Sequence, residues 1–494
     1  MHTHKAIVIG SGVAGLAVAI RLSVQGYAVT VYEKNGEPGG KLSIYKKDGY
    51  SFDTGPSLFT EPDELKALFD LAGENIEAYI SYRELDSGCK YFFVNGKTFQ
   101  TWTDKEKIAQ ESVEEIGEPP QNILQYLQKS EKLYEHIGSV FLNNPLQKRH
   151  TWKKKTFFKA LASVRPRLLF STLNEYHESA FTTGEAIQVF NRFATYNGSN
   201  PYTAPAMLSI IPHIELNKGV FYPGGGMISI TDALHKLAVK KGVEFVFKAP
   251  VQRIICVNNN AKGVVVNNKN IHSDIVVSNT DIYFTYKDLL LDNRKAKQIE
   301  KKEKSSSAVV FLWGIKKQFP QMHLHNIFFS GDYKAEFKTI FQSKSVFKDP
   351  TIYVNITSKM EDDHAPEGKE NWFVMVNVPA DSGQDWARII TFLKQQVLKK
   401  LRGMLKEDIE PLIETEKIIS PPELATATSA NAGAIYGVSS NVWKNAFFRH
   451  PNFSKNINGL YFCGGTVHPG GGIPLCLRSG KIVGEMVERE KLMN

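Results

Sequence analysis

The chain has 494 residues, of which 42% are hydrophobic and 22% charged, and its 60 basic and 51 acidic side chains give a net charge of +9. That length predicts about two to four domains with cores that need no disulfides, and the four scattered cysteines exclude a disulfide scaffold. The modest positive charge fits contact with an anionic lipid surface, whereas nucleic-acid binding would need a concentrated basic patch.

The first apolar stretch, residues 6–20, is too short to cross a bilayer. No basic region precedes it, which disfavours a signal peptide. We therefore expect a cytoplasmic protein without a transmembrane helix.

Residues 5–33 show the pattern of a dinucleotide-binding unit: a buried strand, a glycine-rich turn, a helix, a second strand and an acid. Gly10 permits the tight turn, Gly12 lets the backbone approach a pyrophosphate, and Gly15 lets the helix pack on the sheet. The helix start offers free N–H groups to phosphate, and Glu33 offers acceptors to ribose hydroxyls. A glycine-rich turn without a ligand is the alternative, but it does not explain the acid. The predicted cofactor-binding residues of this unit are Gly10, Gly12, Val13, Ala14, Gly15 and Glu33.

A second glycine turn and a basic residue, Gly39-Gly40-Lys41, follow this unit, and Asp53-Thr54-Gly55-Pro56 follows later. Such an extension suits FAD better than NAD. Together with Glu33-Lys34 and Pro38, these segments resemble the bacterial carotenoid desaturases, flavoproteins of the phytoene desaturase type. The resemblance implies FAD as cofactor and adds six contact residues, which are Lys34, Gly39, Gly40, Lys41, Gly55 and Pro56.

Residues 104–200 are mainly helical in pattern, most clearly over 123–142. Within this region, residues 153–170 interleave cationic and bulky apolar side chains. This pattern predicts either a surface that docks on an anionic membrane and admits a lipid, or a solvated helical lid. Since no nucleic-acid-binding module accompanies the charges, we expect no nucleic-acid partner.

The region 224–279 predicts a glycine turn, a helix over 230–240 and several short strands. In proteins of the resembled family such a region belongs to the FAD-binding domain. The resemblance implies that the backbone of Val251 meets the adenine, whereas the residue alone is equally compatible with a structural valine in a strand.

Residues 305–316, 351–356 and 372–378 predict strands of a second sheet, because they are rich in aromatic and β-branched side chains. Such a sheet could wall an apolar tunnel or form an ordinary core. The nearby run 323–326 contains two histidines but no partner acid or cysteine, so no metal site is expected.

The C-terminal part predicts a buried strand over 459–463, a glycine-rich segment from Gly464 to Pro474, and a helix over 475–490. Dense glycine lets the backbone lie against a flat ring or a pyrophosphate, and the positive end of the helix would stabilise the negative charge of a reduced flavin. A glycine-rich turn without a ligand is again the alternative. The predicted contacts are Gly464, Gly465, Gly472, Ile473 and Pro474.

This segment, with Val467 before His468 and Leu475 after Pro474, resembles the hydroxycarotenoid 3,4-desaturase branch of the family. The resemblance extends over nearly the whole chain. It implies an FAD-dependent enzyme that introduces a C3–C4 double bond into a 1-hydroxycarotenoid by loss of a hydride to flavin N5 and of a proton. Apolar contacts discriminate poorly between similar polyenes, so a polar group is needed to recognise the substrate hydroxyl.

His468 is the candidate catalytic residue for proton handling; its alternative role is to hold the loop by hydrogen bonds. Asp53 is expected to be structural or to bond the flavin. Competing functions are a phytoene desaturase, a flavin-dependent carotene isomerase, and a non-catalytic isoprenoid-lipid escort protein. An amine oxidase fits on fold alone.

We therefore expect an α/β protein with a Rossmann-like FAD-binding domain of the two-dinucleotide-binding flavoprotein type and a discontinuous α+β substrate domain. Its expected partners are a carotenoid substrate and an electron acceptor, quinone or oxygen, and its expected place is the inner face of the membrane, as a peripheral protein. The FAD-binding domain is predicted at 1–103, 220–290 and 415–494, and the substrate and membrane-facing domain at 104–219 and 291–414.

Overall fold

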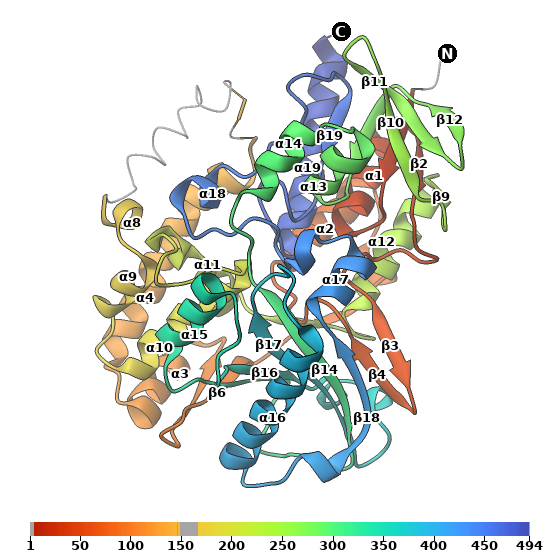
Figure 1. Cartoon of the computed structure of the whole chain (residues 1–494). Coiled ribbons are helices and arrows are strands. Elements are labelled where there is room, and N and C mark those ends of the chain that lie inside the picture. Colours follow the sequence, from red (N-terminus) through yellow and green to blue (C-terminus); the bar gives the residue numbers. More distant parts are fainter. Residues whose placement is uncertain (1–3, 146, 149–165, 494) are drawn as a thin grey trace.

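Two large sheets organise the computed structural model, which describes residues 4–145, 147–148 and 166–493. A five-stranded parallel sheet lies in the upper part of Figure 1 and a seven-stranded, mostly antiparallel sheet in the lower part, with a group of helices beside them. Residues 153–165 of the basic and apolar segment lie outside the described residues. The end of that segment forms α8 (Pro166–Phe170).

The five-stranded sheet gathers strands from distant parts of the chain. Its order is β19-β13-β1-β2-β9, and every pairing is parallel. The predicted strand, glycine turn, helix and strand at the N-terminus are confirmed, with α1 (Val13–Val24) as the helix. The strands are β1 (Lys5–Ile9), β2 (Ala28–Tyr32), β9 (Glu244–Val246), β13 (Ile275–Ser278) and β19 (Leu460–Phe462).

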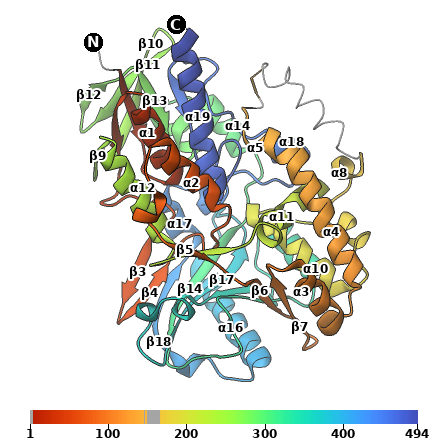
Figure 2. The ribbon, with the colours of Figure 1, turned by 180° about the vertical axis from the view of Figure 1, so that it is seen from behind.

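Helices cover one face of this sheet and a small antiparallel sheet covers the other (Figure 2). On the first face, α1 is hydrophobic on nearly every side and packs against α19 (Ile473–Met493) and α12 (Ile228–Lys240). α2 (Pro62–Leu71) joins the same core. The small sheet consists of β10 (Val251–Val257), β11 (Asn260–Val266) and β12 (Lys269–His272).

The second sheet has the order β18-β14-β17-β16-β15-β6-β7. Because side chains alternate between the faces of a strand, Phe311 and Trp313 pack toward α16 (Trp386–Leu405), whereas Val310 and Leu312 pack toward the helices on the opposite face. Both faces are buried, and the predicted second sheet is confirmed. Its strands are β6 (Ser87–Phe92), β7 (Thr98–Trp102), β14 (Ser307–Ile315), β15 (His325–Phe328), β16 (Ile352–Asn355), β17 (Glu370–Val378) and β18 (Ile413–Ile419).

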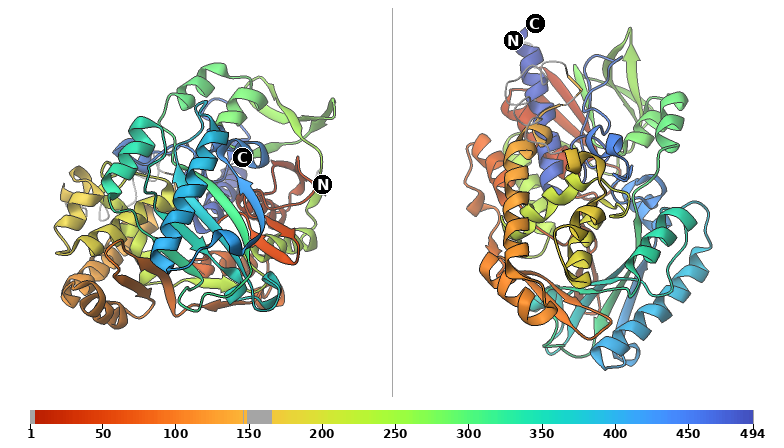
Figure 3. Two further views of the ribbon diagram at one scale, coloured as in Figure 1. Left: turned by 60° about the horizontal axis from the view of Figure 1, so that its bottom comes forward. Right: turned by 90° about the vertical axis from the view of Figure 1, so that its left-hand side faces the viewer.

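The helical group faces the viewer in the right-hand panel of Figure 3. The helix predicted over 123–142 is confirmed as a run of α4 (Pro120–Leu133), a π-helical turn (Tyr134–Gly138) and α5 (Ser139–Leu142). Among the described helices, none combines the length and apolar content that a bilayer crossing requires. The other helices of the group are α3 (Lys105–Glu111), α9 (Leu173–Glu178), α10 (Gly184–Arg192) and α11 (Ile211–Leu216).

Three strands fall differently from the division that the sequence predicts. β6 and β7 lie within 1–103, yet they extend the second sheet, because β6 pairs in parallel with β15. β18 crosses the boundary at 415 and belongs to the same sheet. The pairing of β6 with β15 joins Tyr91 to Ile327, and that of β18 with β14 joins Phe311 to Ile418, so no local pattern indicates either pairing.

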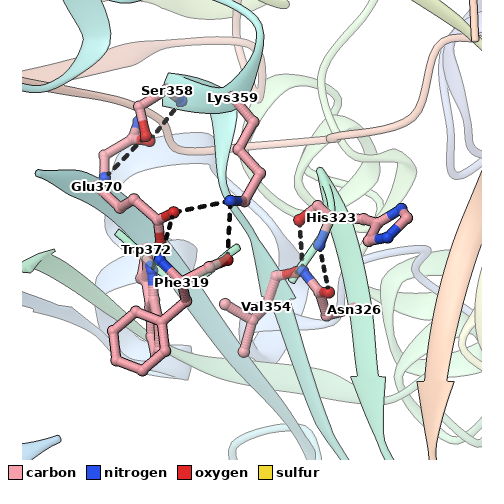
Figure 4. A network of polar contacts seen from close by, with 9 residues as sticks. Phe319, His323, Asn326, Val354, Ser358, Lys359, Glu370 and Trp372 are labelled. Atoms are coloured by element: carbon pink, nitrogen blue, oxygen red, sulfur yellow. Dashed lines mark hydrogen bonds and ion pairs between the residues drawn. The ribbon is translucent and has the colours of Figure 1, made fainter. Parts of the chain in front are cut away.

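Buried polar contacts hold the loops at one end of this sheet (Figure 4). The carboxylate of Glu370 accepts hydrogen bonds from Lys359 Nζ (2.8 Å), Trp372 Nε1 (2.8 Å) and the backbone N–H of Phe319 (3.0 Å). Beside it, Asn326 Nδ2 donates to the carbonyl of His323 (2.6 Å). The histidine-containing run 323–326 therefore comprises the end of the turn before β15 and the first two residues of that strand.

Candidate functional site

The carboxyl ends of four parallel strands meet at one edge of the five-stranded sheet. Gly10 follows β1, Glu33 follows β2, Asn279 follows β13, and Gly464 comes just after β19. Open parallel sheets bind ligands at this edge. The structure thus brings the N-terminal and C-terminal glycine-rich segments together.

The turn between β1 and α1 packs too closely for any residue with a side chain. Gly10 has a φ of +94°, and its N–H donates to the carbonyl of Tyr32 (2.8 Å). A Cβ on Gly15 would lie 2.2 Å from the carbonyl oxygen of Gly10, and one on Gly12 would lie 2.9 Å from Asn279 Oδ1. The glycines therefore keep the helix against the strand.

The first turn of α1 has no side-chain cap, and its N-cap residue is Gly12. The backbone N–H of Leu16 is the first that donates to the carbonyl of Gly12. The N–H groups of Val13, Ala14 and Gly15 therefore lack intrahelical acceptors. An uncapped helix start beside a glycine turn suits a phosphate group.

Glu33 fastens the glycine turn to the next loop. Its carboxylate accepts hydrogen bonds from the N–H and the Oγ of Ser11, both at 2.8 Å, and from the N–H of Asn35 (2.9 Å). The side chain is buried, at 5% exposure. A carboxylate has about four acceptor positions, so capacity remains for a further donor.

The second glycine turn lies directly on the first. Gly39 forms a β-bridge with Gly12, and the N–H of Gly39 donates to the carbonyl of Ser11 (3.1 Å). A Cβ on Gly40 would lie 3.4 Å from the Cα of Gly12. The two predicted glycine turns, Gly10–Gly15 and Gly39–Gly40, therefore form one surface of backbone, which we call the glycine surface.

Lys41 and Gly55 meet beside this surface. A Cβ on Gly55 would lie 1.8 Å from the carbonyl oxygen of Lys41, so only glycine fits before Pro56. Lys41 Nζ donates to the carbonyl of Ile435. Burial lowers the pKa of the Lys41 ammonium, and the nearby Asp281 partly opposes that shift.

The segments around Lys34 and Val251 lie on the other side of Glu33. Lys34 Nζ donates to Ser429 Oγ (2.8 Å). The N–H of Ala249 donates to the carbonyl of Glu33 (2.9 Å), which places the start of β10, and with it Val251, next to the acid. Both predicted residues thus flank the end of β2.

The C-terminal glycine segment runs from β19 to the start of α19. A Cβ on Gly464 would lie 2.6 Å from Asn279 Nδ2, one on Gly465 would lie 3.2 Å from the Cα of Gly471, and one on Gly471 would lie 2.6 Å from the ring of Tyr436. The segment ends where Gly472, at a φ of +111°, leads into α19. The predicted residues Ile473 and Pro474 are the first two of that helix.

Two site residues escaped the sequence analysis. Asn279 touches both glycine segments, and its Nδ2 donates to the carbonyl of Cys463 (3.1 Å). The buried Arg449 donates to the carbonyl of Tyr436 (3.0 Å), and burial lowers its pKa to about 10. An asparagine at the end of a predicted strand was the available signal for the first; Arg449 lies in a segment without a pattern.

His468 holds two loops together. It is buried, at 3% exposure, and its Nε2 donates to the carbonyl of Asn144 (2.9 Å). Its own carbonyl accepts from Asn452 Nδ2 (2.7 Å) and Ser479 Oγ (3.0 Å). Burial lowers the pKa of the imidazole to about 4, so the ring is neutral near pH 7.

Asp53 is the last residue of β4 (Tyr50–Asp53), and its side chain lies at the start of α12 rather than in the glycine surface. Its Oδ2 accepts from the N–H of Met227 (3.0 Å), and its Oδ1 has no partner among the described residues. Burial raises the pKa of this carboxyl. Its contacts fit the structural role predicted for it.

Comparison with known proteins agrees with this geometry. A family model described as "Flavin containing amine oxidoreductase" matches residues 13–485. The chain is 45% identical to a 1-hydroxycarotenoid 3,4-desaturase of Flavobacterium sp. (strain P99-3), over 98% of this chain and 99% of that protein. It is 32% identical to a phytoene desaturase of Fusarium fujikuroi, over 98% and 89% of the two chains. An oxidoreductase of Methanosarcina mazei shares the fold, with a TM-score of 0.65 at 15% identity over 97% of this chain and 100% of that one.

The fold and the glycine surface define a flavoprotein of the dinucleotide-binding type. The chain belongs to the flavin-containing amine oxidoreductase family. Its cofactor is FAD, and the residues present fit that group: an uncapped helix start, two glycine turns without room for side chains, and a buried acid beside them. The predicted family, fold class and cofactor are confirmed.

Proposed function

We propose that this enzyme introduces a C3–C4 double bond into a 1-hydroxycarotenoid in an FAD-dependent desaturation. The observation that carries the proposal is the full-length similarity, at 45% identity, to the 1-hydroxycarotenoid 3,4-desaturase. The phytoene desaturase similarity at 32% supports the same kind of chemistry on a polyene.

In this proposal FAD lies along the carboxyl edge of the five-stranded sheet. The N–H groups at the start of α1 hold the pyrophosphate, Glu33 holds the ribose, and the backbone of Val251 meets the adenine. The positive end of α19, at its start, would stabilise the negative charge of a reduced flavin. The full set of proposed contacts is Gly10, Gly12, Val13, Ala14, Gly15, Glu33, Lys34, Gly39, Gly40, Lys41, Gly55, Pro56, Val251, Gly464, Gly465, Gly472, Ile473 and Pro474.

The reaction removes two hydrogens from a –CH₂–CH₂– unit beside the polyene. FAD, when bound, would accept the hydride equivalent at N5, and the proton of the adjacent carbon would pass to water, a base or the reduced flavin. The protein must place the C3–C4 bond of the carotenoid beside the flavin and exclude water from it. The face of the seven-stranded sheet that carries Tyr353 and Phe373 supports that task, since it packs against aromatic helices within one continuous apolar cluster.

His468 is proposed to act through position. Its Nε2 already donates a hydrogen bond to the carbonyl of Asn144, so that nitrogen has no lone pair for a substrate proton. The ring instead holds residues of the helical group against the C-terminal glycine segment. The alternative role predicted from the sequence, holding the loop, is therefore the one we propose.

The two sheets suggest two discontinuous domains. We propose that the FAD-binding domain contains the five-stranded sheet, its helices and β10–β12. The substrate domain then contains the seven-stranded sheet, including β6, β7 and β18, together with the helical group. This division follows the predicted one except at residues 87–102 and near 415.

We further propose peripheral membrane contact on the inner face and a quinone or oxygen as the final electron acceptor. Phe170, at the end of α8, is 86% exposed and is the last residue of the basic and apolar segment 153–170. Binding to anionic vesicles that weakens with salt and with Phe170→Ser would support the membrane contact; no binding to any vesicle would contradict it.

The function is tested by expressing the protein in cells that accumulate phytoene, lycopene or a 1-hydroxycarotenoid. Loss of two hydrogens and a red-shifted spectrum from the hydroxylated substrate alone is the expected result. Conversion of phytoene would favour a phytoene desaturase, a product of unchanged mass would favour an isomerase, and no conversion by FAD-loaded protein would favour an escort protein.

A further inference from the structure

A charged and hydrogen-bonded cluster lies inside the otherwise apolar region between the seven-stranded sheet and the helical group. At its centre is Arg192, the last residue of α10, with 7% exposure. We name the group the Arg192 cluster. Its members are Ser57, Arg192, Tyr196, Glu215, His325 and Tyr353.

Tyr196 links the charged members of the cluster. Arg192 Nη1 donates to the Tyr196 hydroxyl (3.3 Å), and that hydroxyl donates to Glu215 Oε2. The guanidinium also lies 5.3 Å from the ring centre of Tyr196 and 5.8 Å from that of Tyr353. No carboxylate among the described residues forms a direct ion pair with Arg192, so most of its N–H donors are not used in these contacts.

Glu215, which accepts the hydrogen bond from Tyr196, also has a free acceptor. The side chain is buried, at 2% exposure, and its Oε1 has no hydrogen-bond partner among the described residues. That oxygen lies toward Gly88, where a Cβ would come within 2.8 Å of it. Leaving a buried carboxylate oxygen without a donor costs free energy. Unused donors on Arg192 and an unused acceptor on Glu215 are what a hydroxyl group can satisfy together.

The cluster adjoins the proposed flavin contacts on two sides. Ser57 comes directly after Gly55-Pro56, and its Oγ lies 2.6 Å from the Tyr353 hydroxyl. On the other side, the ring of Tyr436 packs against both Gly471 and Gly198, and Gly198 ends the 3-10 turn (Phe193–Asn197) that follows Arg192 and contains Tyr196. The Arg192 cluster therefore lies between the C-terminal glycine segment and the second sheet.

That location fits the geometry of the proposed substrate. In a 1-hydroxycarotenoid, the carbon that bears the hydroxyl is only two carbon–carbon bonds from C3. A group that recognises the hydroxyl while C3–C4 is over the flavin must therefore adjoin the flavin contacts. A distant polar group would not meet this condition.

We propose that Arg192, Tyr196 and Glu215 bind the hydroxyl group of the substrate and so set the preference for hydroxylated carotenoids. The inference rests on the proposed function and extends it. Arg192 donates a hydrogen bond to the hydroxyl oxygen, and Glu215 Oε1 accepts a hydrogen bond from the hydroxyl group. Sites built to bond a hydroxyl reject analogues without one by as much as about 10⁴–10⁵-fold, because their polar groups are then left unpaired.

The test uses the FAD-loaded protein with a 1-hydroxycarotenoid and the same carotenoid without the hydroxyl. For each variant, the ratio of kcat/KM and the ratio of association constants, from quenching of tryptophan fluorescence, are measured, each as the hydroxylated carotenoid over the one without the hydroxyl. Tyr196→Phe and Glu215→Gln are expected to lower both ratios by about 10–100-fold while the analogue is handled as before. FAD content and the unfolding midpoint, compared with wild type, report on folding.

Tyr126→Phe is the matched control. Tyr126 is buried in the apolar cluster against which the partly buried Tyr196 packs, and its hydroxyl bonds His177 Nε2 (2.9 Å) outside the Arg192 cluster. Its ratios should stay at the wild-type values. Wild type that handles both carotenoids equally, or variants that weaken both substrates to the same degree, would overturn the inference while leaving the desaturase proposal intact. Conversion of neither carotenoid by wild type would contradict the proposed function, and the binding ratios would still decide on the cluster.

Discussion

The carboxylate of Glu33 accepts two hydrogen bonds from Ser11, one from the backbone N–H and one from Oγ, both at 2.8 Å. The acid at the end of β2 therefore holds the glycine turn after β1 through contacts within the protein alone. Since the same carboxylate also accepts from the N–H of Asn35, it holds the start of the loop that leads to the second glycine turn. Such fixed backbone lowers the cost of ordering a cofactor site.

Glu33→Gln is expected to weaken FAD binding by about 10–100-fold, because hydrogen bonds to a charged group contribute about 1.5–3 kcal/mol. Titration of the apoprotein with FAD, followed by flavin fluorescence, measures the change. Glu37→Gln, in the exposed part of the next loop, is the control and should bind FAD as wild type does. Equal affinities for both variants would show that Glu33 does not organise the site.

Gly15→Ala should abolish stable FAD binding and lower the unfolding midpoint, since its Cβ would lie 2.2 Å from a backbone oxygen. Gly403→Ala makes a matched comparison. Gly403 lies inside α16, and a Cβ there would meet nothing within 4 Å. The alanine should stabilise the helix by about 0.5–1 kcal/mol. Chemical denaturation and the FAD content of each purified variant measure both effects. A Gly15→Ala variant with the stability and FAD content of wild type would contradict the close packing.

Glu370→Gln is expected to lower the free energy of unfolding by about 2–4 kcal/mol, because it leaves the ammonium of Lys359 without its buried carboxylate. The exposed pair of Lys66 and Asp70 is the comparison. Asp70→Asn should change stability by less than about 1 kcal/mol. Urea denaturation of both variants gives the difference, and equal effects would mean that the Glu370 contacts contribute little.

Acid should destabilise the fold between pH 6.5 and about 4. Burial lowers the pKa of His177, His450 and His468 to about 4 and that of His325 to about 3. Because each unfolded histidine binds its proton at a higher pH than the folded one, this stability is complete above pH 6.5 and is lost as the pH falls.

His468→Gln should remove part of that dependence, up to about 3 kcal/mol between pH 7 and pH 4. Turnover should fall by less than about 10-fold, whereas loss of a general base costs about 10²–10⁴-fold. The exposed His272→Gln should change neither quantity. Unfolding curves at several pH values and a pH–rate profile separate the two roles, and a large loss of turnover with unchanged stability would make His468 catalytic.

The sequence predicts those parts of the fold whose signals are local. The unit from β1 to Glu33 and the segment from β19 to α19 each carry strand, glycine and helix signals within about 30 residues. The pairing of β6 with β15 carries none, because parallel strands joined across hundreds of residues leave no short-range pattern.

The site divides in the same way. Glycines between a strand pattern and a helix pattern predict a tight turn of backbone, so the candidate FAD contacts are visible in the sequence. Asn279 is visible only as the end of a strand, although it touches both glycine segments. The Arg192 cluster comes from separate elements, each of which has an ordinary pattern alone. Its chemistry depends on the fold that brings Arg192 to Glu215.

The most direct measurement is the structure of the product that purified, FAD-loaded protein makes from a 1-hydroxycarotenoid. Mass spectrometry and NMR together give the mass change and the position of the new double bond. The account predicts the loss of two hydrogens and a double bond at C3–C4, with little product from the carotenoid that lacks the hydroxyl. A double bond elsewhere, a gain of oxygen, or a product of unchanged mass would contradict it.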